Sequence, residues 1–281
     1  MLTKNYLATY AKSFNWAGFF LPKNTYSDCS KLYDFCRTAD NIADDQNSLE
    51  LKNKIFYEFK EAFNKKDQNN SIIKNMWGLI EKFNISPKII EDLFDGIHSD
   101  IKEEVKLNSK KELLIYSYRV AGTVGLMMAK ILKVEDKNSL RSAINLGIAM
   151  QLTNISRDVI EDEINNRSYI NANLETIKST IFFADKFYDN SFYAMKKIPL
   201  SLRFSIIVAR RIYRKIGHKI IKIKTFEEYK NSGKIFVNNY EKILETLLSI
   251  FDLIKLTTLN NDIIDHNHDL IEEEININER I

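Results

Sequence analysis

The fold is decided by the stretch Gln151-Leu152-Thr153-Asn154-Ile155-Ser156-Arg157-Asp158-Val159-Ile160-Glu161-Asp162, in the middle of a long helical pattern. Asn154, Asp158 and Asp162 recur every four residues, so on an α-helix they stack on one face about 6 Å apart. The preceding residues 144–150 are almost wholly apolar, which predicts a helix buried on most sides. Carboxylates in such surroundings need a cation beside them, and an oxygen-only ligand set favours Mg²⁺.

A second stretch repeats this pattern: Cys36-Arg37-Thr38-Ala39-Asp40-Asn41-Ile42-Ala43-Asp44. Asp40 and Asp44 are four residues apart, and Arg37 lies one turn earlier. Two facing helices, each with an aspartate stripe and an arginine, can hold Mg²⁺ ions that bind diphosphate oxygens and keep several waters. One such stripe alone is more often a solvated helix face, but two together favour the metal site.

Composition predicts an all-α protein with short connections, because only eight Gly and three Pro occur in 281 residues. Pro22, Pro87 and Pro199 each stand where a periodic segment begins, a position that tolerates proline. We expect a single domain over residues 1–281, with a polar, acidic and marginally ordered tail from about residue 257.

The helices are expected over about 25–45, 48–66, 70–83, from Pro87 onward, 111–132, 138–165, 174–197, 199–224 and 232–255.

The net charge of +3 argues against a nucleic-acid partner, since basic and acidic residues are evenly mixed. Cys29 and Cys36 are about 10 Å apart along one predicted helix, too far to form a disulfide, which indicates reduced thiols in a cytoplasmic protein. No stretch is long and apolar enough to span a membrane. Peripheral contact with the inner face of a membrane stays open, and we expect a monomer or a weak oligomer.

The segment Tyr116-Ser117-Tyr118-Arg119-Val120-Ala121-Gly122-Thr123-Val124-Gly125-Leu126-Met127-Met128 places two glycines inside a predicted helix. Each glycine there costs about 1 kcal/mol against alanine, so some contact must offset it. Either another helix packs closely at these positions, or the small residues form part of the apolar wall of a ligand cavity.

With these residues in view, the chain resembles the squalene/phytoene synthase family from about Lys12 to Tyr240. The resemblance rests on the two aspartate stretches, on Asn166 to Tyr169 as a Gly-Arg-x-Tyr element, on Lys12-Ser13-Phe14, and on the Tyr116 to Gly125 segment. It implies a helical bundle of the class I isoprenoid synthase type with a central active-site cavity.

The resemblance also implies the site residues. Mg²⁺ ligands would be Asp40, Asp44, Asn154, Asp158 and Asp162, the four aspartates being catalytic. Diphosphate would be bound by Lys12, Ser13, Arg37, Arg157 and Tyr213. Lys234 stands where relatives carry a diphosphate-binding arginine, and it keeps the charge without the bidentate geometry. Tyr116 and Tyr118 are candidates to stabilise a carbocation through their ring faces.

The implied reaction is the head-to-head condensation of two prenyl diphosphates through a cyclopropyl diphosphate. The Val120 to Met127 segment is most similar to phytoene synthases, which suggests geranylgeranyl diphosphate as substrate, Mg²⁺ (or Mn²⁺) as cofactor and no NADPH. The alternative is a farnesyl diphosphate-using synthase of squalene, presqualene diphosphate or dehydrosqualene. A non-catalytic assembly factor of the same fold is the third reading.

Overall fold

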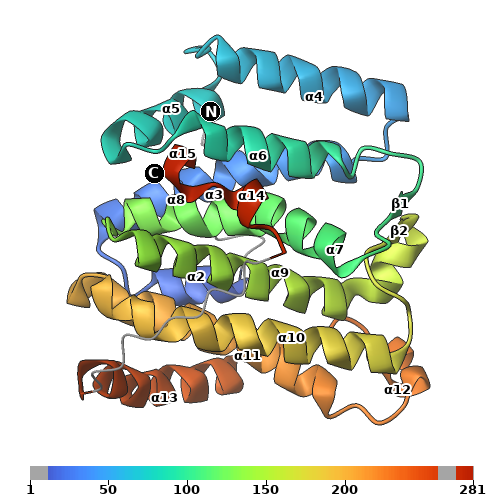
Figure 1. The fold of residues 1–281 in the computed structure, drawn as a ribbon, viewed down its shortest axis with the longest axis vertical. Helices are drawn as coiled ribbons and strands as arrows, with labels where there is room; N and C mark the ends of the chain where they lie inside the picture. The colour runs from blue at the N-terminus through green and yellow to red at the C-terminus, as the bar shows by residue number, and fades with distance from the viewer. Residues whose placement is uncertain (1–11, 259–269, 281) are drawn as a thin grey trace.

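The computed structural model describes residues 12–258 and 270–280, and helices dominate this part of the chain (Figure 1). The first half contains α2 (Lys12–Gly18), α3 (Lys23–Asp44), α4 (Leu49–Asn64), α5 (Ser71–Phe83), α6 (Pro87–His98), α7 (Lys110–Ser117), the π-helix η1 (Tyr118–Gly122) and α8 (Thr123–Ile131). The second half contains α9 (Lys137–Ile164), α10 (Leu174–Phe192), the 3₁₀-helix η2 (Tyr193–Lys197), α11 (Leu200–Ile221), α12 (Phe226–Asn231), α13 (Asn239–Thr258), α14 (Glu272–Ile275) and α15 (Ile277–Arg280). The predicted all-α class is confirmed.

Helix starts follow local sequence signals. The three prolines stand where predicted: Pro22 and Pro199 precede α3 and α11, and Pro87 is the first residue of α6. Elsewhere a short polar side chain accepts a hydrogen bond from a free backbone N–H of the first turn, as Asp136 does from Ser139 N at 2.9 Å before α9.

Helix α9 is the centre of the bundle and packs against α8 on one side and α10 on the other (Figure 1). Its residues Ile144, Ile148 and Leu152 are fully buried, as the apolar run predicted. In the view of Figure 1, α4, α5 and α6 lie above this centre, and α10, α11 and α13 lie below it. The two aspartate stretches lie in the C-terminal halves of α3 and α9.

Two predicted helices differ from the structure, one by an interruption and one by a later start. The expected helix 111–132 is interrupted by η1, whose wider turn lets the backbone pass close to α9. The expected helix 232–255 begins only at Asn239, because Gly233 adopts φ +61° and residues 232–238 run without helix. These residues are still ordered by burial of Ile235 and Val237.

Part of the expected polar tail is packed on the body. Residues 259–269 and 281, with His266 and His268, lie outside the described residues. Within 270–280, Ile271 and Ile275 are buried, and the guanidinium of Arg280 binds Asp92 with distances of 2.6 and 2.9 Å. Residues 270–280 therefore pack on the body of the protein through two buried isoleucines and an ion pair with α6, and the marginal order expected of the tail stays a prediction.

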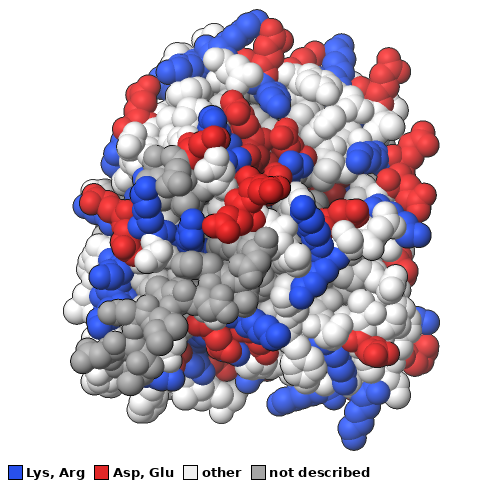
Figure 2. All heavy atoms as spheres, viewed as in Figure 1, with Lys and Arg blue, Asp and Glu red and all other residues white. Residues whose placement is uncertain are grey.

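The surface carries mixed charge on the face shown in Figure 2, where Lys and Arg lie among Asp and Glu. Cys29 and Cys36 are free thiols, as predicted. Among the described helices, none combines the length and the apolar character that crossing a membrane requires.

Candidate active site

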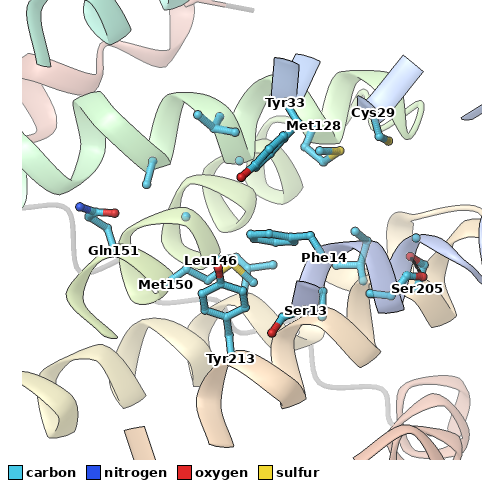
Figure 3. Close-up of a pocket in the computed structure, with 18 of the residues that line it drawn as sticks. Ser13, Phe14, Cys29, Tyr33, Met128, Leu146, Met150, Gln151, Ser205 and Tyr213 are labelled. Atoms are coloured by element: carbon cyan, nitrogen blue, oxygen red, sulfur yellow. Dashed lines mark hydrogen bonds between the residues drawn. The ribbon is translucent and has the colours of Figure 1, made fainter. Parts of the chain in front are cut away.

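A cavity of about 1250 Å³ lies inside the bundle, between α2, α3, η1, α8, α9 and α11 (Figure 3). Much of its wall is apolar, and Phe14, Tyr33 and Tyr213 project into it from three different helices. The rings of Phe14 and Tyr213 are 4.8 Å apart, centroid to centroid. Such a space suits a long apolar ligand.

The small residues of η1, α8 and α9 serve both functions that the sequence left open. A Cβ added to Gly147 would lie 2.2 Å from the carbonyl oxygen of Ala121, and one added to Gly125 would lie 2.3 Å from that of Ala143. The helices are therefore in backbone contact at these glycines. The same four residues also line the cavity, so this close approach shapes its wall.

The six residues predicted to bind diphosphate all line this one cavity, although they are spread from position 12 to position 234. They are Lys12, Ser13, Arg37, Arg157, Tyr213 and Lys234. Together with Lys242, which also lines it, the cavity combines an apolar wall with five cationic side chains, a combination suited to a ligand with an anionic group and a long apolar part.

The first aspartate stretch presents one carboxylate to the cavity. Asp40 lines it, and Arg37 lies 3.7 Å from Asp40 and 3.6 Å from Asp44. Half of the Asp40 side-chain surface is accessible, and this side chain is one of those that line the cavity. The surrounding protein, and next the carboxylate of Asp44, raise the pKa of Asp40 to about 7. Asp44 does not line the cavity.

The second stretch lies on α9 across from the first. Asn154 and Arg157 line the cavity, whereas Asp158 and Asp162 are not among the residues that line it. Asp158 accepts from Arg157 Nε at 2.8 Å and lies 3.7 Å from Lys234 Nζ. Burial, followed by the nearby Asp158, raises the pKa of Asp162 to about 7.

Arg167 connects the two stretches. Its guanidinium donates to Asp44 at 2.8 Å and to the carbonyl of Ala43 at 3.1 Å. Burial and a neighbouring carboxylate raise the pKa of Asp40 and of Asp162, and the positive charge of Arg167 offsets part of that rise. Strand β2 (Arg167–Ser168) places it there by pairing in parallel with β1 (Val105–Lys106). Arg167 is therefore bound to the first stretch and acts on the second through its charge.

A buried hydrogen-bonded group lies behind Arg167. The hydroxyls of Tyr116 and Tyr169 donate to Asp100 at 2.7 and 2.8 Å and lie 3.1 Å from each other. Burial raises the pKa of Asp100. Tyr116 and Tyr118 do not line the cavity, and Tyr118 donates to Asp92 at 2.6 Å. Their predicted contact with a carbocation has no support in this geometry.

Sequence reasoning left Asp100, Arg167 and Tyr169 out of the site. The signal for Arg167 and Tyr169 was present in the Gly-Arg-x-Tyr-like element, where Asn166 replaces the usual glycine. Asn166 has φ +56°, and asparagine is the residue other than glycine that most readily adopts this conformation. The departure from the family pattern therefore preserves the turn that leads into β2.

The donor set fits a hard cation. The side-chain oxygen of Asn154 is buried and has no hydrogen-bond partner among the described residues, and two carboxyls of the aspartate stretches, Asp40 and Asp162, have pKa values raised to about 7. Among the described residues, no three His, Cys, Asp or Glu side chains come close enough to hold one ion unaided. Mg²⁺ commonly binds through one or two carboxylates, with waters and substrate phosphates completing its coordination.

Comparison with known proteins gives the family. Residues 7–175 match the family profile described as squalene/phytoene synthase. A 15-cis-phytoene synthase from Pantoea ananas is 27% identical over 253 residues, which cover 76% of this chain and 80% of that protein. A phytoene synthase from Cereibacter sphaeroides is 28% identical over 247 residues, covering 76% of this chain and 69% of that protein.

Solved structures show the same fold. A dehydrosqualene synthase crystallised in complex with ligand superposes with a TM-score of 0.68 at 24% identity, covering 89% of this chain and 94% of that one. A squalene synthase from Alicyclobacillus acidocaldarius superposes with a TM-score of 0.62 at 18% identity, covering 76% of this chain and 88% of that one. Together with the profile match over more than half of the sequence, these findings show that the chain belongs to the squalene/phytoene synthase family of prenyltransferase-type enzymes.

Proposed function

We propose that this protein joins two geranylgeranyl diphosphates head to head and forms phytoene, with Mg²⁺ as cofactor. The observation that carries the proposal is one cavity in which five cationic side chains and Asp40 accompany a long apolar wall. Its volume of about 1250 Å³ exceeds the roughly 300–1,000 Å³ of ordinary ligand pockets, as two prenyl chains would require.

The cationic residues bind and orient the diphosphates. Arg37 and Arg157 already contact the aspartates of their own stretches, so both can hold an anionic group beside those carboxylates. Lys12 and Lys234 add two further positive charges to the lining. Such groups stabilise a diphosphate most strongly as it gains charge on leaving.

The two aspartate stretches would hold Mg²⁺ through Asp40, Asp44, Asn154, Asp158 and Asp162. When bound, the ion supplies positive charge that neutralises a diphosphate and assists its departure. The group of Asp100, Tyr116 and Tyr169 supports Arg167 from behind, and we assign these residues a positioning role.

The apolar wall protects the reaction. Departure of the first diphosphate leaves an allylic cation, which the double bond of the second substrate attacks. Loss of one proton gives a cyclopropyl diphosphate. Departure of the second diphosphate, rearrangement and loss of a second proton give the hydrocarbon, without a reductant. The wall excludes water that would otherwise react with the cations.

The chain length of the substrate has one alternative. The relatives from Pantoea ananas and Cereibacter sphaeroides are named as phytoene synthases, which favours geranylgeranyl diphosphate. The structural similarity to a dehydrosqualene synthase keeps farnesyl diphosphate as the second candidate, with squalene, presqualene diphosphate or dehydrosqualene as product.

The test is to incubate the purified protein with geranylgeranyl or farnesyl diphosphate, with and without NADPH, and to identify extracted products by mass spectrometry. We expect phytoene from geranylgeranyl diphosphate alone, and reversible loss of activity when a chelator removes Mg²⁺. A product derived from farnesyl diphosphate would change the assigned substrate and leave the assigned reaction class unchanged. Formation of no product from either substrate, in a folded protein, would favour the non-catalytic reading.

A further inference from the structure

Helix α13 is attached to the protein by its polar side. Of its twenty residues, the buried ones are Lys242, Glu245, Ser249 and Leu256, three of them polar. An ordinary surface helix does the opposite and buries its apolar stripe.

The inner contacts of α13 are mainly ion pairs with α11. Arg211 binds Glu245 at 2.9 Å and Asp252 at 2.8 Å, and Lys219 binds Glu241 at 2.8 Å. All three carboxylates of the helix are thus directed toward the body of the protein. This arrangement leaves the opposite side of α13 without an acidic residue.

The outer side of α13 is apolar. Seven large side chains are exposed along it, from 40% to 76% of their surface: Tyr240, Ile243, Leu244, Leu247, Ile250, Phe251 and Ile254. They recur at steps of three and four, so they form one continuous stripe about 21 Å long on the helix. Lys255 is the exposed charged residue on this side of the helix.

The stripe begins where the cavity ends. Asn239 and Lys242, in the first turn of α13, line the cavity, and so does Phe236, which is 67% exposed. An apolar molecule leaving the cavity along these residues would therefore meet the stripe. Figure 1 shows α13 at the lower edge of the bundle, next to α11.

We propose that the outer side of α13 docks on the surface of a phospholipid bilayer that contains anionic lipid. A helix with a polar face and a broad apolar face lies flat in the interface, with the apolar face among the acyl chains. The absence of carboxylates on this side and the net charge of +3 suit an anionic surface. The proposed hydrocarbon product, which rests on the proposed function, would pass from the cavity directly into lipid.

A second copy of the chain fits the stripe less well. The stripe covers about two heptads, whereas coiled-coil pairing is typically sustained over at least three or four. Leu244 and Phe251 also widen it beyond the narrow seam that two paired helices bury. Within α13, the one charged side chain classed as exposed is Lys255 near the end, so this helix offers little charge that could fix a partner helix.

The experiment is co-flotation of the full protein with vesicles of phosphatidylcholine mixed with phosphatidylglycerol, or of phosphatidylcholine alone, without substrate or Mg²⁺. The variant L247E/F251E places two charges on the stripe. The matched control Y57E/F182E alters two rings that are each 55% exposed on α4 and α10, comparable with Leu247 at 54%. Circular dichroism checks that all proteins are folded.

We expect the wild type and the control to float with mixed vesicles. The affinity of L247E/F251E for these vesicles should be at least about tenfold lower. Binding that is as tight to phosphatidylcholine alone would overturn the anionic-lipid assignment. A wild type that does not float, or a variant that floats equally well, would overturn the docking surface. A dimer in analytical ultracentrifugation that L247E/F251E dissociates, without vesicle binding, would assign the stripe to a second copy. None of these readouts depends on hydrocarbon synthesis.

Discussion

Replacing Gly147 by alanine should destabilise the protein, although alanine is the better helix former. The added Cβ would lie 2.2 Å from the carbonyl oxygen of Ala121 and 2.7 Å from its carbon, where ordinary contact begins at 3.4 Å. Helices α9 and η1 would have to separate by about 1 Å. Overpacking costs about 1–3 kcal/mol, and a clash with backbone, which cannot rotate away, belongs at the upper end.

Helix propensity acts in the opposite direction by up to about 1 kcal/mol, so we expect a net loss of about 2 kcal/mol in the free energy of unfolding. Urea unfolding followed by circular dichroism measures it. Gly78→Ala is the matched control, because a Cβ there meets nothing within 4 Å and should stabilise by about 0.5–1 kcal/mol. If Gly147→Ala were as stable as the wild type, the close backbone approach would be wrong.

Three further predictions concern the site and the C-terminal segment. Asp158→Asn should lower hydrocarbon formation about 100-fold or more while the far-ultraviolet dichroism stays unchanged, and full activity would refute the metal assignment. Because the pKa values of Asp40 and Asp162 are raised to about 7, the folded metal-free protein holds more protons than the unfolded chain between about pH 4 and pH 7, and its stability should fall as the pH rises through that range. Mg²⁺ must displace those protons, so the rise in Tm that it produces should be larger at pH 8 than at pH 6, and a rise independent of pH would contradict the role of the two carboxyls. Arg280→Ala should lower the free energy of unfolding by about 3 kcal/mol, because it leaves the largely buried carboxylate of Asp92 without its cation; Arg280→Lys should recover part of this loss in the same urea titration.

The local features of the fold could be predicted from sequence because each depends on neighbouring residues. Apolar spacing predicted α9 within one residue at each end, and the prolines marked three helix starts. The resemblance also predicted residues as distant as Lys12 and Lys234 to share a site, and both line the cavity. Their functions stay predictions.

Other features depend on contacts that no local pattern encodes. Arg167 reaches Asp44 only because two-residue strands far apart in the chain pair in parallel. The packing of residues 270–280 depends on the ion pair of Arg280 with Asp92, nearly two hundred residues away. The orientation of α13, with its polar side buried, could not be predicted for another reason. An amphipathic pattern does not tell which side of a helix faces inward, and here the ion pairs with α11 decide it.

The π-helix η1 has a consequence for how the length of this chain can vary. A π turn is an α-helix that has accepted extra residues without losing its axis. Deleting one residue elsewhere in a buried helix rotates everything beyond it by about 100°, one residue's share of a turn. Within Tyr118–Gly122, a deletion can instead relax the turn to α and leave α7 and α8 in their present registers. The wall of the cavity thus contains a position where the protein can lose a residue and keep its fold, so the shape of the cavity can diverge between relatives without redesign of the bundle.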